Sequence, residues 1–134
     1  MTNQVVEQYV EGTMDVVFPP RSDASEEDMR LFRQNLYDRP RATTLPVLRS
    51  IHLDAEGNLW VEPDFLPGDP APPWQVFRAD GTWLGTVTMP PDLDRGFIAY
   101  QAPYLQIGPD FLLGIFTDEM GVEYVRMYGL VKDE

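Results

Sequence analysis

The chain has 134 residues, 43% of them apolar and 12% aromatic, with no cysteine and a formal net charge of −12 from 22 acidic and 10 basic residues. This length and composition predict one packed globular domain, residues 1–134. The lack of cysteine excludes disulfides, thiolate metal sites and cysteine nucleophiles. The acidic balance argues against nucleic-acid or anionic-membrane partners, which are bound largely by clustered basic side chains.

No apolar run approaches the ~20 residues of a membrane span. The polar start, MTNQVVEQ, lacks the basic and apolar regions of a secretory signal. A complete chain of this kind is expected to be soluble and cytoplasmic, and the compartment is otherwise open.

Residues 1–20 are predicted to form a β-hairpin. The runs QVVEQYV and MDVVF are rich in β-formers, and EGT at residues 11–13 supplies a turn between them. Two prolines at residues 19–20 end the pairing, because proline cannot donate to a strand ladder.

One helix is predicted over about residues 25–38. Ser25 is a good N-cap, with Asp28 three residues later and further acidic residues in the first turn. One apolar stripe follows, made of Met29, Phe32 and Leu36. The stripe is narrow, so we expect the helix to cap an existing core.

From residue 45 onward the sequence predicts strands joined by Gly/Asp/Pro turns, which is typical of an antiparallel meander. The expected strands are residues 47–54, 58–63, 74–80, 82–89, 104–108, 111–118 and 122–131. Many carry large apolar residues on both faces; in 111–118, Phe111, Leu113 and Ile115 oppose Leu112 and Phe116. Strict alternation would leave one face in water, so these sheets are expected to be covered on both sides.

Small four-stranded meanders packed between neighbours are typical of a β-propeller, whereas a closed barrel would give apolar-in, polar-out strands. The stretch IHLDAEGNLWVEP, continued by WQVFRADGTWLGTV, resembles one blade of an NHL-type propeller. Its two Gly turns then join the inner two and the outer two strands of that blade. Similar segments occur in bacterial six-bladed propellers, mostly uncharacterised.

The resemblance implies an all-β partial propeller with four parts. These are an outer hairpin of a preceding blade (1–20), a helical insertion (21–44), a full blade (45–90) and a three-stranded last blade (91–134). A partial ring leaves sheet faces exposed, which predicts a protein partner or self-association, with a ring of about three copies as one arrangement.

The resemblance supports two functions. The first is a non-catalytic binding scaffold of unknown ligand. The alternative is part of a lactonase- or hydrolase-like propeller enzyme with a cation on the ring axis, although none of that family's ligands maps onto a position here.

Ser50, His52 and Asp54 share one strand face and suggest a Ser-His-Asp triad. Residues two apart are ~6.6 Å apart along a strand, whereas a triad needs linked hydrogen bonds near ~3 Å, so a polar structural face is expected instead. His52 is the sole histidine, which excludes a multi-histidine metal site.

Two other groups could bind ligands. Loop carboxylates at residues 66–70 and 91–94 could hold a hard cation, but neither loop matches a calcium motif. An aromatic platform could be built from Trp60, Trp74, Trp83, Tyr100 and Tyr104. Strand aromatics more often pack between sheets. No catalytic residue, metal site or cofactor is therefore predicted.

Overall fold

The computed structural model describes residues 1–93 and 105–132. The chain divides into two compact units, residues 1–47 with 64–71 and residues 48–63 with 72–134. It passes from the first unit to the second, returns to the first for residues 64–71, and then stays in the second. None of the described helices is long and apolar enough to cross a membrane.

The predicted N-terminal hairpin is wrong, because this segment forms helix α1 (Asn3–Val17). Thr2 caps the helix by accepting a hydrogen bond from the Val5 N–H. The helix buries Val10 and Met14, which are four residues apart and therefore lie on one helical face. This spacing overrides the β-propensity of the valines, and the predicted EGT turn lies inside the helix.

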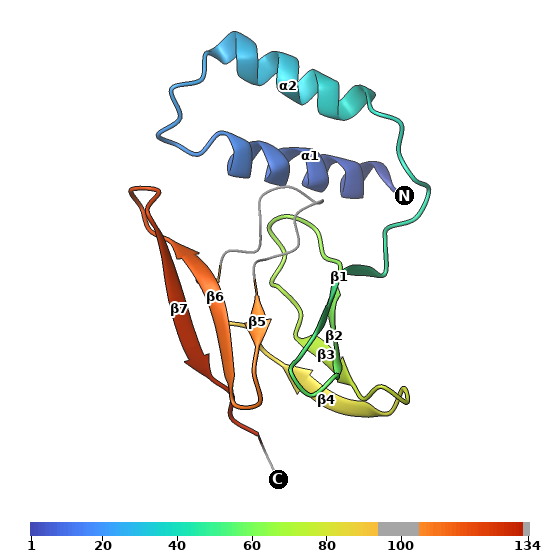
Figure 1. Cartoon of the computed structure of the whole chain (residues 1–134). Helices are drawn as coiled ribbons and strands as arrows, with labels where there is room; N and C mark the ends of the chain where they lie inside the picture. Colours follow the sequence, from blue (N-terminus) through green and yellow to red (C-terminus); the bar gives the residue numbers. More distant parts are fainter. Residues whose placement is uncertain (94–104, 133–134) are drawn as a thin grey trace. The chain divides into compact units, whose positions relative to one another are not determined.

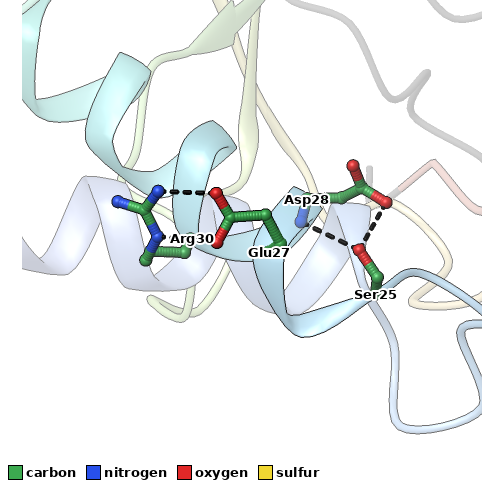
Figure 2. Close-up of polar contacts among 4 residues, drawn as sticks. All are labelled: Ser25, Glu27, Asp28 and Arg30. Atoms are coloured by element: carbon green, nitrogen blue, oxygen red, sulfur yellow. Dashed lines mark hydrogen bonds and ion pairs between the residues drawn. The ribbon is translucent and has the colours of Figure 1, made fainter.

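Helix α2 (Glu26–Asp38) confirms the predicted helix and its cap. The Ser25 hydroxyl accepts a hydrogen bond from the Asp28 N–H at 3.1 Å and donates to the Asp28 carboxylate at 2.7 Å. Arg30 pairs with Glu27 one turn along (Figure 2). The cap therefore satisfies an N-terminal backbone donor that would otherwise have no intrahelical partner.

The two helices run side by side in opposite directions (Figure 1). They share a small core of Val10, Met14 and Leu36, with Met29 and Phe32 packed against it. The narrow apolar stripe predicts that helix α2 caps a core formed by other elements. In the structure, helix α2 instead contributes to the core of the first unit. A bidentate pair between Arg33 and Glu11 also joins the helices.

Gly12 lets residues 64–71 approach helix α1. A Cβ at this position would lie 2.3 Å from the Pro67 Cβ and 3.0 Å from its carbonyl oxygen. We expect Gly12→Ala to lower the free energy of unfolding by about 1 kcal/mol. An overpacking cost of about 1–3 kcal/mol outweighs a helix-propensity gain of about 1 kcal/mol. Urea unfolding followed by far-UV circular dichroism measures this, and Pro67→Gly in the same chain should restore part of the loss. A plain stabilisation by Gly12→Ala would contradict the contact.

Sheet A is an antiparallel meander whose four strands follow chain order, which confirms the meander predicted for residues 45–90. The strands are β1 (Leu48–Leu53), β2 (Leu59–Pro63), β3 (Trp74–Phe77) and β4 (Trp83–Val87). In register, His52 lies opposite Trp60 and Trp60 lies opposite Val76. These residues therefore share one face, here called the inner face of sheet A.

Sheet B has three antiparallel strands, also in chain order, as predicted for residues 91–134. They are β5 (Gln106–Ile107), β6 (Phe111–Thr117) and β7 (Glu123–Gly129). Leu112 pairs with both Ile107 and Tyr128, which places these three side chains on the inner face of sheet B.

One five-residue turn joins β1 to β2, β3 to β4 and β6 to β7, at residues 54–58, 78–82 and 118–122. In each, the first N–H donates to the fifth carbonyl, at 3.0, 2.8 and 3.0 Å, and the fourth-position Gly N–H returns to the first carbonyl. The glycines have φ of 81°, 87° and 79°, which favours glycine over other residues. The paired Gly turns seen in the sequence are therefore one hairpin device, used a third time in sheet B.

The inner faces of sheets A and B share the hydrophobic core of the second unit. This core contains Trp60, Trp74 and Val76 from sheet A, Ile107 and Leu112 from sheet B, and Met89 and Leu93 from the connection. A backbone hydrogen bond from the Ala55 N–H to the Ile107 carbonyl, 2.9 Å, also joins the sheets.

The outer faces of the two sheets are apolar and largely exposed. On sheet A, Leu53 lies opposite Leu59, with Phe77 and Trp83 in the same cross-strand row. Leu53 is 69% exposed and Trp83 57%. On sheet B, the outer face includes Val125 and Met127, which are 75% and 71% exposed. The strand pattern predicts cover on both faces, but among the described residues each sheet is covered on one face.

Candidate binding groove and buried polar cluster

A polar cluster of Ser50, His52 and Glu62 lies on the otherwise apolar inner face of sheet A. The Ser50 hydroxyl donates to Glu62 Oε2 at 2.6 Å, and His52 Nε2 lies 3.2 Å from the same hydroxyl oxygen. Glu62 is only 1% exposed. The His52 ring packs against the Trp74 ring, with centroids 5.2 Å apart and planes tilted by 31°. These contacts fix the side chains where the first two strands meet the core.

The direction of the hydrogen bonds limits what this cluster can do. Ser50 has one hydroxyl proton, which is directed to the Glu62 carboxylate, so His52 donates its Nε2 proton to Ser50 in this arrangement. A histidine that acts as general base must instead accept the serine proton. The order His52–Ser50–Glu62 is therefore that of a half-buried polar network and differs from a nucleophile–base–carboxylate relay.

Side-chain positions change two parts of the sequence interpretation. Ser50 and His52 come within 3.2 Å although they are two residues apart, because their side chains lean together. Asp54, the expected third member, lies in the β1–β2 turn and has other partners. Glu62, on the neighbouring strand β2, is the third member of the cluster.

Asp54 organises the β1–β2 turn and anchors a core tryptophan. One carboxylate oxygen accepts the N–H groups of Glu56 and Asn58, and the other accepts from the Asn58 side chain and from Trp60 Nε1 at 3.0 Å. Burial acts to raise the pKa of Asp54, but the hydrogen bonds from Trp60, Asn58 and the backbone outweigh it and hold the pKa below 3.8. The Asp54 carboxylate therefore holds the β1–β2 turn and the Trp60 indole in place.

Burial lowers the pKa of His52 below 6.5, and the nearby Glu62 charge offsets this only in part. The folded state therefore binds a proton less readily than the unfolded state, so stability falls as the pH drops below about 6.5. We expect urea midpoints to decline between about pH 7 and about pH 5, and His52→Gln to flatten that decline. Equal slopes in the wild type and the variant would contradict this assignment.

A groove of about 780 Å³ lies in the second unit beside strand β4. Its apolar wall includes Trp60, Val76, Met89 and Leu112, and the segment 129–132 lines its other side. Lys132 and Glu56 lie at its polar end, 3.6 Å apart. The groove is of the size that holds small ligands, and the polar residues Asp54, Asn58 and Lys132 are among those that line it.

The proposed aromatic platform is divided between different environments. Trp60 and Trp74 are buried in the core. Trp83 is exposed, and its indole N–H donates to the Gln75 side chain at 2.9 Å. Tyr100 and Tyr104 lie outside the described residues. Trp60 and Trp83 both line the groove.

The loop carboxylates considered for a cation have protein partners. Asp69 accepts a hydrogen bond from Gln8 at 2.7 Å. Asp92 pairs with Arg126 and accepts from the Tyr128 hydroxyl at 3.1 Å, and Asp94 lies outside the described residues. Across residues 1–93 and 105–132, no three histidine or carboxylate side chains converge as a metal site would require.

No protein-family model, curated protein or solved structure matches the chain.

Proposed function

We propose that the chain is a non-catalytic binding scaffold, a partial β-propeller in which sheets A and B are successive blades. The observation that carries this proposal is that both sheets bury their inner faces against a common core and present apolar outer faces to solvent. Contiguous exposed apolar faces are typical of association sites. Fold alone does not assign function, so the proposal rests on these surfaces.

The propeller assignment is supported by three features. Each sheet is a meander in chain order, the sheets pack through their faces, and the same Gly turn recurs in both. These features are typical of radially repeated sheets. Since residues 3–17 are helical, the chain contributes two blades to this arrangement, without the preceding hairpin.

Further copies of the chain are the partners that we propose for the outer faces. A head-to-tail contact places the outer face of sheet A in one copy against the outer face of sheet B in the next, and such heterologous contacts close into rings when the rotation allows. Roughly three copies would supply about six sheets, the size of a common propeller ring.

Sedimentation equilibrium tests this association. We expect the average mass to rise between about 1 and about 100 μM, and Leu53→Lys or Met127→Lys to keep the chain monomeric by placing a charge on one outer face. Tyr9→Lys, on the exposed surface of helix α1, is the control and should associate like the wild type. A wild-type chain that stays monomeric over this range would refute self-association.

The enzyme alternative predicts a stabilising cation. A ligand that binds only the folded state at about 100 times its Kd adds about 2.7 kcal/mol, which corresponds to several degrees in Tm. For the scaffold we expect millimolar calcium to shift Tm by less than about 1 °C. A thermal melt with and without calcium measures this, with magnesium at equal ionic strength as the control. A calcium-specific rise of several degrees would favour the enzyme.

A further inference from the structure

Strand β7 has an open backbone edge. The Leu130 N–H donates to the Asp110 carbonyl, and the Asp118 N–H donates to the Val122 carbonyl. In an antiparallel pair, hydrogen-bonded and non-hydrogen-bonded positions alternate, so even-numbered residues of β7 bond to β6. Odd-numbered residues 123–129 therefore direct their N–H and C=O groups away from β6. No described strand pairs with them.

Strand β7 has few of the features by which proteins usually block strand addition, and its charged side chains are Glu123 and Arg126. Its register with β6 runs without a shift through all seven residues, and the strand contains no proline or lysine. Strand β4, the corresponding last strand of sheet A, has five residues and an irregular register near Gly85. Among the described residues sheet A has four strands and sheet B three, so one strand added beside β7 would give both sheets four.

The charges around this edge favour a cationic partner. Asp110 lies at one end of the β6–β7 pair, and Glu119 and Glu123 lie at the other. Arg126 is paired with Asp92 and Lys132 with Glu56, so both cations within residues 105–132 have carboxylate partners. Between the acidic ends lie the exposed apolar side chains of Val125 and Met127.

We propose that the β7 edge binds an extended peptide segment that alternates apolar and polar residues and carries lysine or arginine at both ends. The segment adds to sheet B as a fourth strand, with its backbone bonded to residues 123, 125, 127 and 129. Its apolar side chains extend the patch of Val125 and Met127, and its basic ends face Asp110 at one end and Glu119 and Glu123 at the other. This inference deepens the proposed scaffold function by naming the chemistry of one partner.

The test titrates three synthetic peptides of about nine residues into the full chain by fluorescence anisotropy. Each has a core of alternating valine and threonine. The first has Lys-Arg ends, the second has Glu ends, and the third has Lys-Arg ends with the core valines N-methylated. The chain carries Leu53→Lys, so that association between copies through the outer faces does not obscure the anisotropy signal. Failure of the peptide proposal can then be distinguished from failure of the proposed outer-face association.

We expect the basic-ended peptide to bind at least about tenfold more tightly than the acidic-ended one at low salt, and this ratio to shrink at high salt. N-methylation should abolish binding, because it removes the backbone donors. Combined Glu119→Gln and Glu123→Gln should weaken the basic-ended peptide severalfold. Val125→Pro should abolish binding without removing a β6–β7 hydrogen bond, since its N–H faces the open edge.

Three results would overturn the inference. Equal affinity for basic and acidic ends would remove the charge argument, and binding that survives N-methylation would exclude strand addition. In the third result, the chain binds no peptide but associates with itself, and Val125→Pro abolishes that association. A second copy of the chain would then be the occupant of the β7 edge. The N-methylated peptide tests strand addition on a β7 edge without substitutions, so strand addition can be tested even if Val125→Pro does not fold.

Discussion

Replacing Trp74 by alanine is expected to lower the free energy of unfolding of the second unit by about 3–5 kcal/mol. Trp74 has no exposed surface, lies in the shared core of the two sheets and packs against His52. Loss of a side chain this large removes its transfer energy and leaves a cavity that the sheets can fill only in part. Urea unfolding followed by far-UV circular dichroism measures the change without depending on the lost fluorophore.

Two tryptophan variants serve as controls. Trp83→Ala removes a side chain that is 57% exposed on the outer face, so its cost should stay below about 1 kcal/mol. Trp74→Phe should recover most of the alanine loss, because Trp74 Nε1 is buried without a hydrogen-bond partner in the structure and phenylalanine has no such donor. Similar losses for Trp74→Ala and Trp83→Ala would contradict the placement of the core.

Replacing Asp54 by alanine is expected to lower the free energy of unfolding by about 2 kcal/mol. The substitution removes a carboxylate that accepts four hydrogen bonds, and it leaves the indole N–H of the buried Trp60 without an acceptor. Asp118 gives a matched control. It begins the equivalent turn of sheet B and caps two backbone N–H groups, and Asp118→Ala should cost less.

The pH dependence gives Asp54 a second signature. Its folded pKa lies below the ordinary value of 3.8, so its contribution to stability is present above that pH and is lost as the pH falls through the folded pKa. Asp54→Asn should therefore reduce the loss of stability in acid. Unfolding midpoints measured at several pH values below about 5 test this, and an unchanged acid dependence in Asp54→Asn would contradict it.

The strands were predictable because their turns are strong local signals. Each Gly turn at residues 54–58, 78–82 and 118–122 is short and fixes its own hairpin, so neighbouring strands follow without tertiary information. The β-branched residues of the N-terminal segment predict strands, but Val10 and Met14, four residues apart, bury one helical face and the segment is helical. The glycine at position 12 predicts a turn, but in the structure it lies inside helix α1 and permits the close approach of Pro67.

Local sequence patterns do not indicate that Glu62 joins the polar cluster with Ser50 and His52. Its role depends on the residue opposite it, and register is a property of two strands together. The turn at residues 54–58 does define that register, since pairing outward from it places Ser50 opposite Glu62. Local sequence patterns do not indicate the division into two units, because residues 64–71 join the helices through tertiary contacts such as Gly12 with Pro67.

The proposed contact between the two outer faces of different copies can be tested directly, because the chain has no cysteine. Chains carrying Leu53→Cys are mixed with chains carrying Met127→Cys and oxidised gently. We expect a disulfide-linked heterodimer to form at least about tenfold more efficiently than in a mixture of Leu53→Cys with Tyr9→Cys, because only geometry that brings Cα atoms within about 7 Å allows the bond. Equal yields in the two mixtures would contradict the claim.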